Sequence, residues 1–161
     1  MMRAKAESTI PAIHRIPAPT PEAIEILNEY YESLEIQLRD TADSLAHYVA
    51  SPNSGLWLAT LSGQVVGCVI LRPLPSLPHA AECKRLYLRP AARGRGLAHA
   101  LLIALESYAR EQGYRSLYLD THHGLTAAIA LYHARGYQDC ERYNDNPQAT
   151  IFMQKILRQE P

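Results

Sequence analysis

Apolar residues recur at helical spacing in four segments of the chain, and each segment predicts an amphipathic helix. The longest stripe lies between residues 97 and 112. Its members are Leu97, Leu101, Leu102, Leu105, Tyr108 and Ala109. An earlier helix begins at Pro21, a shorter one begins behind a cap at Asp40 or Thr41, and the last covers residues 125–136.

Two of these helices have apolar faces that can be named residue by residue. We expect the first helix to face the core with Ile24, Leu27, Tyr31 and Leu34. We expect the last helix to face the core with Leu125, Ala128, Ile129 and Tyr132. A tyrosine in such a stripe suits packing as well as chemistry, so both interpretations of Tyr132 stay open at this point.

Segments rich in β-formers separate or flank the helices and predict short strands. They cover residues 12–16, 56–61, 64–71, 80–88, 116–121, 137–142 and 150–157. Ser62-Gly63 fits the tight turn of a hairpin. A strand, the long helix and a second strand then form a parallel crossover. The pattern predicts an α/β fold with a mixed sheet, in one domain over residues 12–161 that follows a disordered leader at residues 1–11.

Composition and net charge exclude some classes of binding partner. The chain has 161 residues, of which 47% are hydrophobic and 20% charged, and its formal net charge is +0. A neutral chain has no overall field to attract nucleic acid, and no apolar run is long enough to cross a bilayer. The three cysteines Cys68, Cys83 and Cys140 lack CxxC spacing, which favours free thiols in a reducing compartment. We therefore expect a cytoplasmic protein that binds neither nucleic acid nor a membrane.

A glycine-containing turn joins a strand to the long helix. It reads Arg93-Gly94-Arg95-Gly96-Leu97-Ala98. A helix start offers unpaired NH groups and a positive dipole end, so it favours an anion where small residues allow close approach. An ordinary strand-to-helix turn would use glycine for its backbone freedom alone. A dinucleotide fingerprint is disfavoured because its third glycine position holds His99, and the Gly-Lys-Ser/Thr ending of a phosphate loop is absent.

In its context this turn resembles the pyrophosphate loop of the GNAT N-acetyltransferase superfamily, whose pattern is Gln/Arg-x-x-Gly-x-Gly/Ala after a β-strand. Arg93, Gly96 and Ala98 match that pattern. The likeness continues upstream through residues 84–90 and downstream through 116–121 and 128–137. It covers about residues 56–157, and the chain before residue 56 agrees only in its coarse order of elements.

The resemblance implies a fold and a cosubstrate. The fold would be a single domain with a mixed, mostly antiparallel sheet, a splayed central parallel pair and about four flanking helices. The cosubstrate would be acetyl-CoA, with no metal. The resemblance implies that the pantetheine arm pairs with the backbone of Leu86, Tyr87 and Leu88. The pyrophosphate would lie against Arg93, Gly94, Arg95, Gly96, Leu97 and Ala98.

The resemblance also implies catalytic roles. Tyr132 matches the family's general acid, which protonates the departing thiolate. Glu82 is the candidate base that removes the amine proton, although water can do this instead, and a strand-edge ion pair would explain Glu82 equally well. The family often carries Asn where this chain has Leu125, so Thr121 or Thr126 would have to supply that hydrogen bond to the cofactor.

The acceptor is the least constrained part of the assignment. The resemblance implies a primary amine of a small molecule, an amino acid or a peptide, bound by a monomer or a homodimer. Variable aromatic positions are the candidates for contacting it, namely Tyr30, Tyr31 and Tyr143. The adjacent His122 and His123 lack the carboxylate or cysteine spacing of a metal site. A non-catalytic acyl-CoA sensor and an unrelated nucleotide-binding α/β protein are the alternatives.

Overall fold

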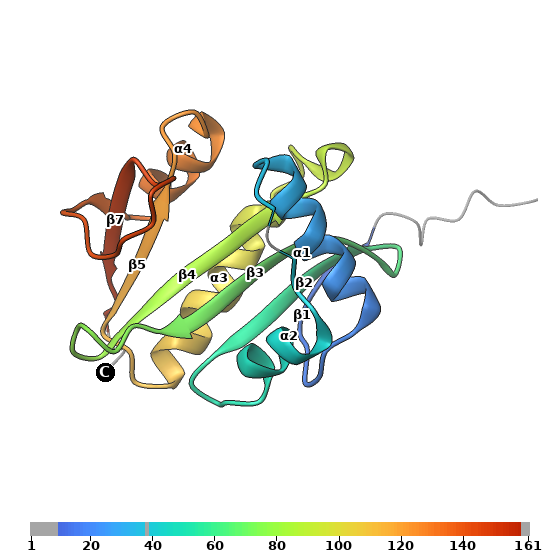
Figure 1. Ribbon diagram of the computed structural model, residues 1–161, viewed down its shortest axis with the longest axis horizontal. Helices are drawn as coiled ribbons and strands as arrows, with labels where there is room; N and C mark the ends of the chain where they lie inside the picture. Colours follow the sequence, from blue (N-terminus) through green and yellow to red (C-terminus); the bar gives the residue numbers. More distant parts are fainter. Residues whose placement is uncertain (1–9, 38, 159–161) are drawn as a thin grey trace, which may run out of the picture.

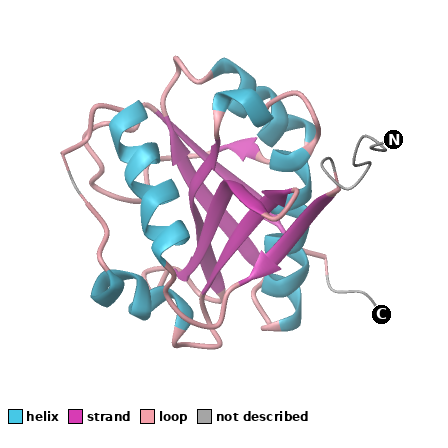
Figure 2. Ribbon diagram, turned by 90° about the vertical axis from the view of Figure 1, so that its right-hand side faces the viewer, coloured by secondary structure: helices cyan, strands magenta, loops and turns pink. Residues whose placement is uncertain are grey.

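The computed structural model of the chain describes residues 10–37 and 39–158 and contains one mixed sheet with helices on both faces (Figures 1 and 2). Its strands are β1 Pro11–Arg15, β2 Gly55–Leu61, β3 Gln64–Pro73, β4 Ala80–Leu88, β5 Ser116–Thr121, β6 Gln138–Asp139 and β7 Ile151–Ile156. Its helices are α1 Pro21–Ser33, α2 Ala42–Val49, α3 Leu97–Glu111 and α4 Thr126–Ala134, with a 3₁₀ turn at Pro90–Ala92. Most of the expected leader, residues 1–9, lies outside the described residues.

The sheet has seven strands in the order β1-β2-β3-β4-β5-β7-β6. The pair β4 and β5 is parallel, as the crossover through α3 requires, and the neighbouring pairs are antiparallel. The predicted α/β class, the mostly antiparallel sheet and the parallel central pair are thus confirmed. Among the described residues, no helix combines the length and apolar character that a membrane span needs.

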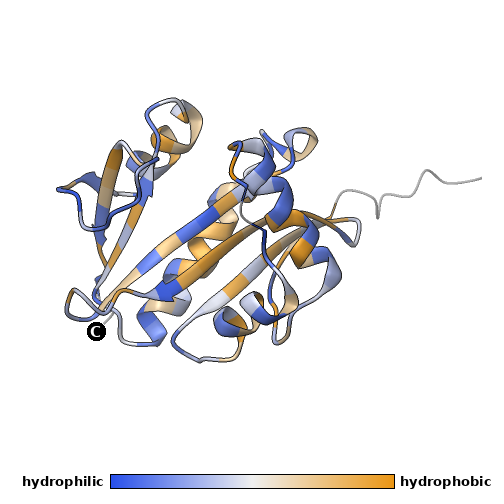
Figure 3. Cartoon of the chain, in the orientation of Figure 1, coloured by the Kyte–Doolittle hydropathy of each residue, from blue (hydrophilic) through white to orange (hydrophobic). Residues whose placement is uncertain are grey.

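Two apolar clusters hold the helices to opposite faces of this sheet. One joins α1 and α2 to β2, β3 and β4, and its members include Ile26, Leu27, Leu45, Leu56 and Ile70. The other joins α3 to the strands, and its members include Leu101, Leu105, Val69, Leu117 and Met153. Figure 3 shows this apolar colouring along the central strands and α3. The predicted stripe of α3 is confirmed as a core face.

Side chains cap the first two helices, and of the two predicted caps for the second helix the structure has Thr41. The Thr20 hydroxyl accepts a hydrogen bond from the Ala23 NH, and Thr41 forms a reciprocal capping box with Ser44. The apolar face of α1 is rotated from the one expected. Its buried residues are Ala23, Ile26, Leu27 and Tyr31, because the stripe follows the sheet surface instead of the most apolar line in the sequence.

The expected strand over residues 137–142 is largely wrong. Only Gln138–Asp139 pairs with β7, and after the Cys140 NH donates to the Phe152 carbonyl the chain leaves the sheet. Side chains of the following loop bond instead to carboxylates on β4 and β5, as described below. These polar contacts compete with the ladder and hold the loop against β4 and β5.

The parallel pair β4 and β5 separates soon after it begins. The two strands pair only at Ala80–Glu82 with Ser116–Tyr118, and Figure 1 shows them diverging beyond that point. From Cys83 onward β4 is therefore paired on its β3 side alone. The predicted splayed pair is confirmed, and the gap opens toward the carboxyl ends of both strands.

A β-bulge in β4 faces this gap. Cys68 pairs with Tyr87 and Ile70 pairs with Lys84, so two residues of β4, Arg85 and Leu86, stand opposite one residue of β3. Arg85 takes a left-handed backbone conformation with φ of 57°. For a residue with a Cβ atom that conformation costs about 1–2 kcal/mol. The surrounding structure must hold the bulge in place.

Gly67 allows β3 to approach the carboxyl end of β4. A Cβ atom at Gly67 would lie 2.3 Å from Leu88 Cδ2 and 2.8 Å from the Tyr87 carbonyl oxygen. Because one of these atoms belongs to the backbone, Gly67→Ala must push the strands apart, and we expect a loss of about 1–3 kcal/mol of unfolding free energy. Urea unfolding measures it, with the exposed Gln64→Ala of the same strand as control. Equal midpoints for the two variants would contradict this account.

Candidate functional site

The gap between β4 and β5 holds two adjoining cavities, of about 430 and 490 Å³. Both are of the size that small-molecule sites usually have. They share part of their lining, which identifies them as two ends of one cleft. The shared residues are Tyr30, Leu34, Leu86, Leu125 and Ala128.

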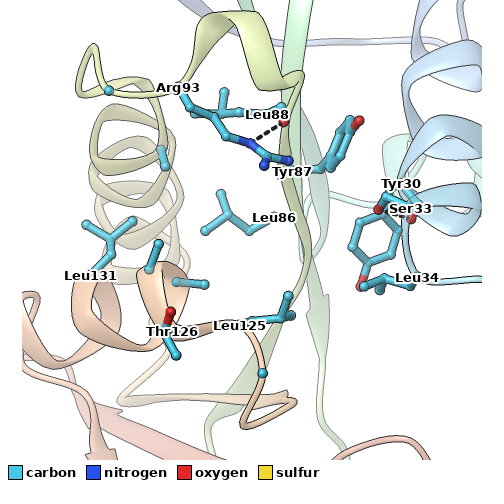
Figure 4. Close-up of a pocket in the computed structure, with 15 residues that line it drawn as sticks. Tyr30, Ser33, Leu34, Leu86, Tyr87, Leu88, Arg93, Leu125, Thr126 and Leu131 are labelled. Carbon is cyan, nitrogen blue, oxygen red and sulfur yellow. Dashed lines mark hydrogen bonds between the residues drawn. The ribbon is translucent and has the colours of Figure 1, made fainter.

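The first cavity lies between the carboxyl end of β4, the start of α3 and the helix α4 (Figure 4). Leu86 projects into its centre, with Leu131 and Thr126 on one side and Tyr30 with Leu34 on the other. The β4 backbone beside this cavity lacks a β5 partner. An extended ligand can therefore add to the free strand edge through main-chain hydrogen bonds.

The turn before α3 closes the far end of this cavity. Gly94 and Gly96 have φ of 80° and 78°, a left-handed conformation that favours glycine, and a Cβ atom on either would meet nothing within 4 Å. Within the described part of the chain, no side chain caps the first turn of α3. Its first NH groups are thus left without a side-chain acceptor, as an anion site needs.

The predicted cofactor residues divide into two groups. Those on the cavity wall are Leu86, Tyr87, Leu88, Arg93, Gly94 and Ala98. Arg93 is held there because its Nε donates to the Leu88 carbonyl at 3.1 Å and its guanidinium lies over the Tyr87 ring (Figure 4). The others, Arg95, Gly96 and Leu97, do not line the cavity, and the Leu97 side chain is part of the core. Leu97 could contribute only through its backbone.

Tyr132 lies at the second cavity, on the buried side of α4. Its side chain is 7% exposed and its ring packs edge-on against Tyr137. Burial is the main cause that raises the pKa of Tyr132 well above its ordinary value. Within residues 10–37 and 39–158 its hydroxyl has no hydrogen-bond partner. A protonated phenol with a free OH thus faces the cleft.

Glu82 is held behind the cavity wall. It is 1% exposed, and neither cavity includes it in its lining. Its carboxylate accepts from Arg72 Nε at 2.7 Å, from the Tyr143 hydroxyl at 2.7 Å and from Asn144 Nδ2 at 3.2 Å. Tyr143 is therefore tied to Glu82 and does not contact the cleft. Burial, followed by the Glu82 charge, raises the pKa of the Tyr143 phenol.

Asp120, which our sequence reasoning missed, lies on the cleft beside Lys84. Its carboxylate is 8% exposed and accepts from Lys84 Nζ at 2.7 Å, Asn144 Nδ2 at 2.6 Å and Asn146 Nδ2 at 3.3 Å. Burial alone would raise the pKa of Asp120, but the Lys84 ammonium and the two amides outweigh it and hold that pKa below its usual range. A single charged residue within a strand that has no other charge was the available signal.

Arg85 is a second residue that the sequence reasoning missed. Lys84 lies opposite Ile70 on the α1 and α2 side of the sheet, and the bulge turns Arg85 to that same side. There its Nε donates to the Tyr31 hydroxyl, which in turn donates to Asp40 at 2.9 Å. Two consecutive cations in a strand break the usual alternation, and that break was the signal for a bulge.

The tyrosines predicted to contact an acceptor are placed differently from one another. Tyr30 lines both cavities, and burial is the main cause that raises the pKa of its phenol. Tyr31 lies one layer further back, bonded to Arg85 and Asp40. Only Tyr30 can therefore touch a ligand directly, and Tyr31 can act on one only through Arg85.

Thr121 and Thr126, the candidates to replace the Asn that this chain lacks at Leu125, lie at different cavities. Leu125 lies at the start of α4, where no side chain caps the helix, and it is part of the lining of both cavities. Thr126 lines the first cavity and Thr121 the second. Both threonines can thus reach a ligand in the cleft, from opposite ends.

Comparisons with known proteins point to one family. Residues 20–137 match the profile described as the acetyltransferase (GNAT) family. An uncharacterized N-acetyltransferase of Schizosaccharomyces pombe is 28% identical over 148 residues, which span 88% of this chain and 90% of that protein. Mouse N-acetyltransferase 8 is 36% identical over 102 residues, which span 62% of this chain and 45% of that protein.

One solved structure supplies a comparison for the fold. A Salmonella typhimurium protein whose structure contains its cofactor acetyl-CoA superimposes with a TM-score of 0.71. The match covers 92% of this chain and 96% of that one, at 21% sequence identity. The arrangement of strands and helices is thus the same over nearly the whole length.

Proposed function

Because this chain belongs to the acetyltransferase (GNAT) family, we propose that it transfers the acetyl group of acetyl-CoA to a primary amine by direct attack, with Tyr132 as the general acid. The observation that carries the proposal is the unbonded Tyr132 hydroxyl in the gap between the split strands. The family supplies the reaction class, an acetyl-CoA-dependent N-acetyltransferase. The residues and the amine acceptor are the proposed part.

The cofactor binds along the first cavity in this proposal. The free edge of β4 at Leu86, Tyr87 and Leu88 pairs with the amides of the pantetheine arm. The uncapped start of α3 takes the pyrophosphate, with Arg93 beside it. The apolar residues of α4 cover the arm. This arrangement directs the thioester toward the second cavity, where Tyr132 lies.

The transfer step needs two proton movements. The amine nitrogen attacks the thioester carbonyl carbon, a C–N bond forms, and the C–S bond breaks as the carbonyl reforms. The departing thiolate takes the Tyr132 phenol proton, and the nitrogen loses a proton to water that returns it to the phenolate. The raised pKa of Tyr132 keeps the phenol protonated between turnovers.

The base is the less determined partner. Glu82 remains the residue that the sequence nominates, but its carboxylate is almost fully buried and its bonds are taken by Arg72, Tyr143 and Asn144. Those contacts support deprotonation through water, with Glu82 fixing the wall of the cleft. Glu82→Gln with unchanged kcat would favour the water route, and a large loss of kcat would favour Glu82.

A direct assay tests the proposal against the sensor alternative. Protein, acetyl-CoA and a panel of primary amines are incubated while free thiol is followed, and CoA binding is measured by calorimetry. We expect saturable binding and amine-dependent thiol release. Binding without release across the panel would favour an acyl-CoA sensor. Stabilisation in thermal melting by NAD or ATP instead of CoA would favour an unrelated nucleotide-binding protein.

The glycine turn offers a matched test of the cofactor site. Gly96→Ala adds a methyl group where the protein leaves open space at the start of α3, and we expect the Kd for CoA to rise about tenfold or more. Gly113→Ala is the control, since Gly113 has φ of 85° and equally open surroundings at the opposite end of α3. Both variants should lose similar stability. An equal loss of CoA affinity in both would contradict the site.

A further inference from the structure

The Arg85 guanidinium lines the second cavity but is only partly hydrogen-bonded. Its side chain is 16% exposed, and its Nε bonds to Tyr31. Nη1 is buried and has no hydrogen-bond partner within residues 10–37 and 39–158. Among the described residues Nη2 finds no acceptor either. Both terminal nitrogens, Nη1 and Nη2, are thus left without a partner. In arginine such nitrogens often donate paired hydrogen bonds to a planar oxyanion.

Two other arginines have an unbonded buried nitrogen, and they differ from Arg85. Both Arg15 and Arg135 lack a partner at Nε. Nη2 of Arg15 donates to the Ser54 carbonyl at 2.7 Å, and Nη2 of Arg135 donates to the Glu106 carboxylate. Neither arginine lines the cleft. Arg85 is therefore the one of these three arginines whose unmet donor, at Nη2, a ligand in the cleft could satisfy.

The surroundings fix Arg85 without neutralising it by a direct hydrogen bond. The guanidinium lies 5.5 Å from the Tyr31 ring centre and 5.2 Å from that of Tyr48, which holds its plane. Asp40 is 3.9 Å from Nε, and its oxygens accept from Tyr31 and Ser44. Asp40 thus forms an ion pair on the Nε side of the guanidinium, and Nη2 remains available to a ligand.

The neighbouring cation is already committed. Lys84 Nζ lies 2.7 Å from Asp120 and 3.5 Å from Glu82, and both carboxylates are buried. Lys84 therefore has little capacity for another anion. The strained bulge turns Arg85 toward the cleft. Because strained backbone often marks functional positions, the bulge supports a binding role for Arg85.

We propose that Arg85 binds the carboxylate of the acceptor, so that the acceptor is an amine that also carries a carboxylate, as an α-amino acid does. The assignment rests on the proposed acetyl transfer. The carboxylate accepts from Nη2, the terminal nitrogen that is not buried, and the amino group of the same molecule lies toward Tyr132 in the same cavity. Apolar residues of the wall, including Leu34 and Ile36, leave room for an uncharged side chain.

The test uses matched pairs of acceptors. Thiol release from acetyl-CoA is followed with the α-amino acids leucine, methionine and phenylalanine, and with the primary amide of each. For the wild type we expect kcat/KM to be about 10- to 100-fold higher for the acid than for its amide. Arg85→Gln should reduce that ratio to near one, because kcat/KM should fall much more for the acids than for the amides.

The controls separate recognition from folding. Arg110→Gln makes the same chemical change away from the cleft, and it should keep the acid preference. Arg85→Lys keeps the charge but loses the planar fork, so it should retain only part of the preference. This variant replaces Arg85→Gln if the latter does not fold. An acid preference that persists in Arg85→Gln, or a wild type that uses the amides equally well, would overturn the proposal.

A binding measurement keeps this inference distinct from the proposed function. The same amino acids and amides are titrated by calorimetry into CoA-saturated protein. Acid-selective binding that is lost in Arg85→Gln supports the carboxylate site, whether or not thiol is released. If no thiol is released, the proposed acetyl transfer fails while the carboxylate site stands. Turnover of amines with no acid-selective binding would support acetyl transfer and overturn the role of Arg85.

Discussion

Tyr132→Phe is expected to lower kcat for acetyl transfer by about 100-fold or more while the Kd for CoA stays unchanged. The change removes one oxygen from a side chain that already packs in the core, so the fold should persist. The lost proton is needed only as the thiolate departs, and the variant should therefore lower kcat and kcat/KM together. Stopped assays of thiol release, with CoA titration, measure both quantities.

Tyr137→Phe is the matched control. Its ring centre lies 5.8 Å from that of Tyr132, but its hydroxyl donates to Glu106 and it does not line the cleft. We expect kcat within about twofold of wild type and a stability loss of about 1 kcal/mol. Because burial raises the pKa of Tyr132 above its ordinary value, its acid form persists through neutral pH. Equal effects of the two variants on kcat would remove Tyr132 from the mechanism.

The turn that we propose binds the cofactor could be placed in the fold from the sequence because its determinants are local. A strand, a glycine turn and a helix start are consecutive in the chain, and the backbone geometry of such a unit follows from residue type. Gly94, Gly96 and the α3 stripe were placed correctly for this reason. The structure adds that the φ angles, and not contacts within the protein, require glycine there.

The proposed acceptor end depends on contacts between distant segments, which the sequence does not reveal. Asp120 meets Lys84 across the split strands, and Asn144 reaches both carboxylates from the loop before β7. The direction of Arg85 depends on a bulge that shifts the alternation of β4 by one residue. Period-two reasoning from the sequence therefore assigns the wrong face to every residue beyond the bulge.

Glu106 helps to hold together the two parts of the molecule on either side of the gap between β4 and β5. With β4 and β5 paired only at their first residues, other contacts must hold α4 and β7 to the rest of the molecule. Glu106 of α3 is 0% exposed and accepts from Lys155 Nζ at 2.7 Å and from the Tyr137 hydroxyl at 3.2 Å. Arg135, at the end of α4, bonds to the same carboxylate. One buried anion of α3 thus holds β7 and the segment that follows α4.

Glu106→Gln should therefore lower the unfolding free energy by about 3–5 kcal/mol, because two cations lose the buried charge that compensates them. The exposed Glu111→Gln on the same helix should change it by less than about 0.5 kcal/mol. Urea unfolding followed by fluorescence of Trp57, which lies in the core beneath α3, measures both. A loss confined to Glu106→Gln would show that the charge cluster supports the open half of the sheet. Near-equal midpoints would instead assign that support to apolar packing.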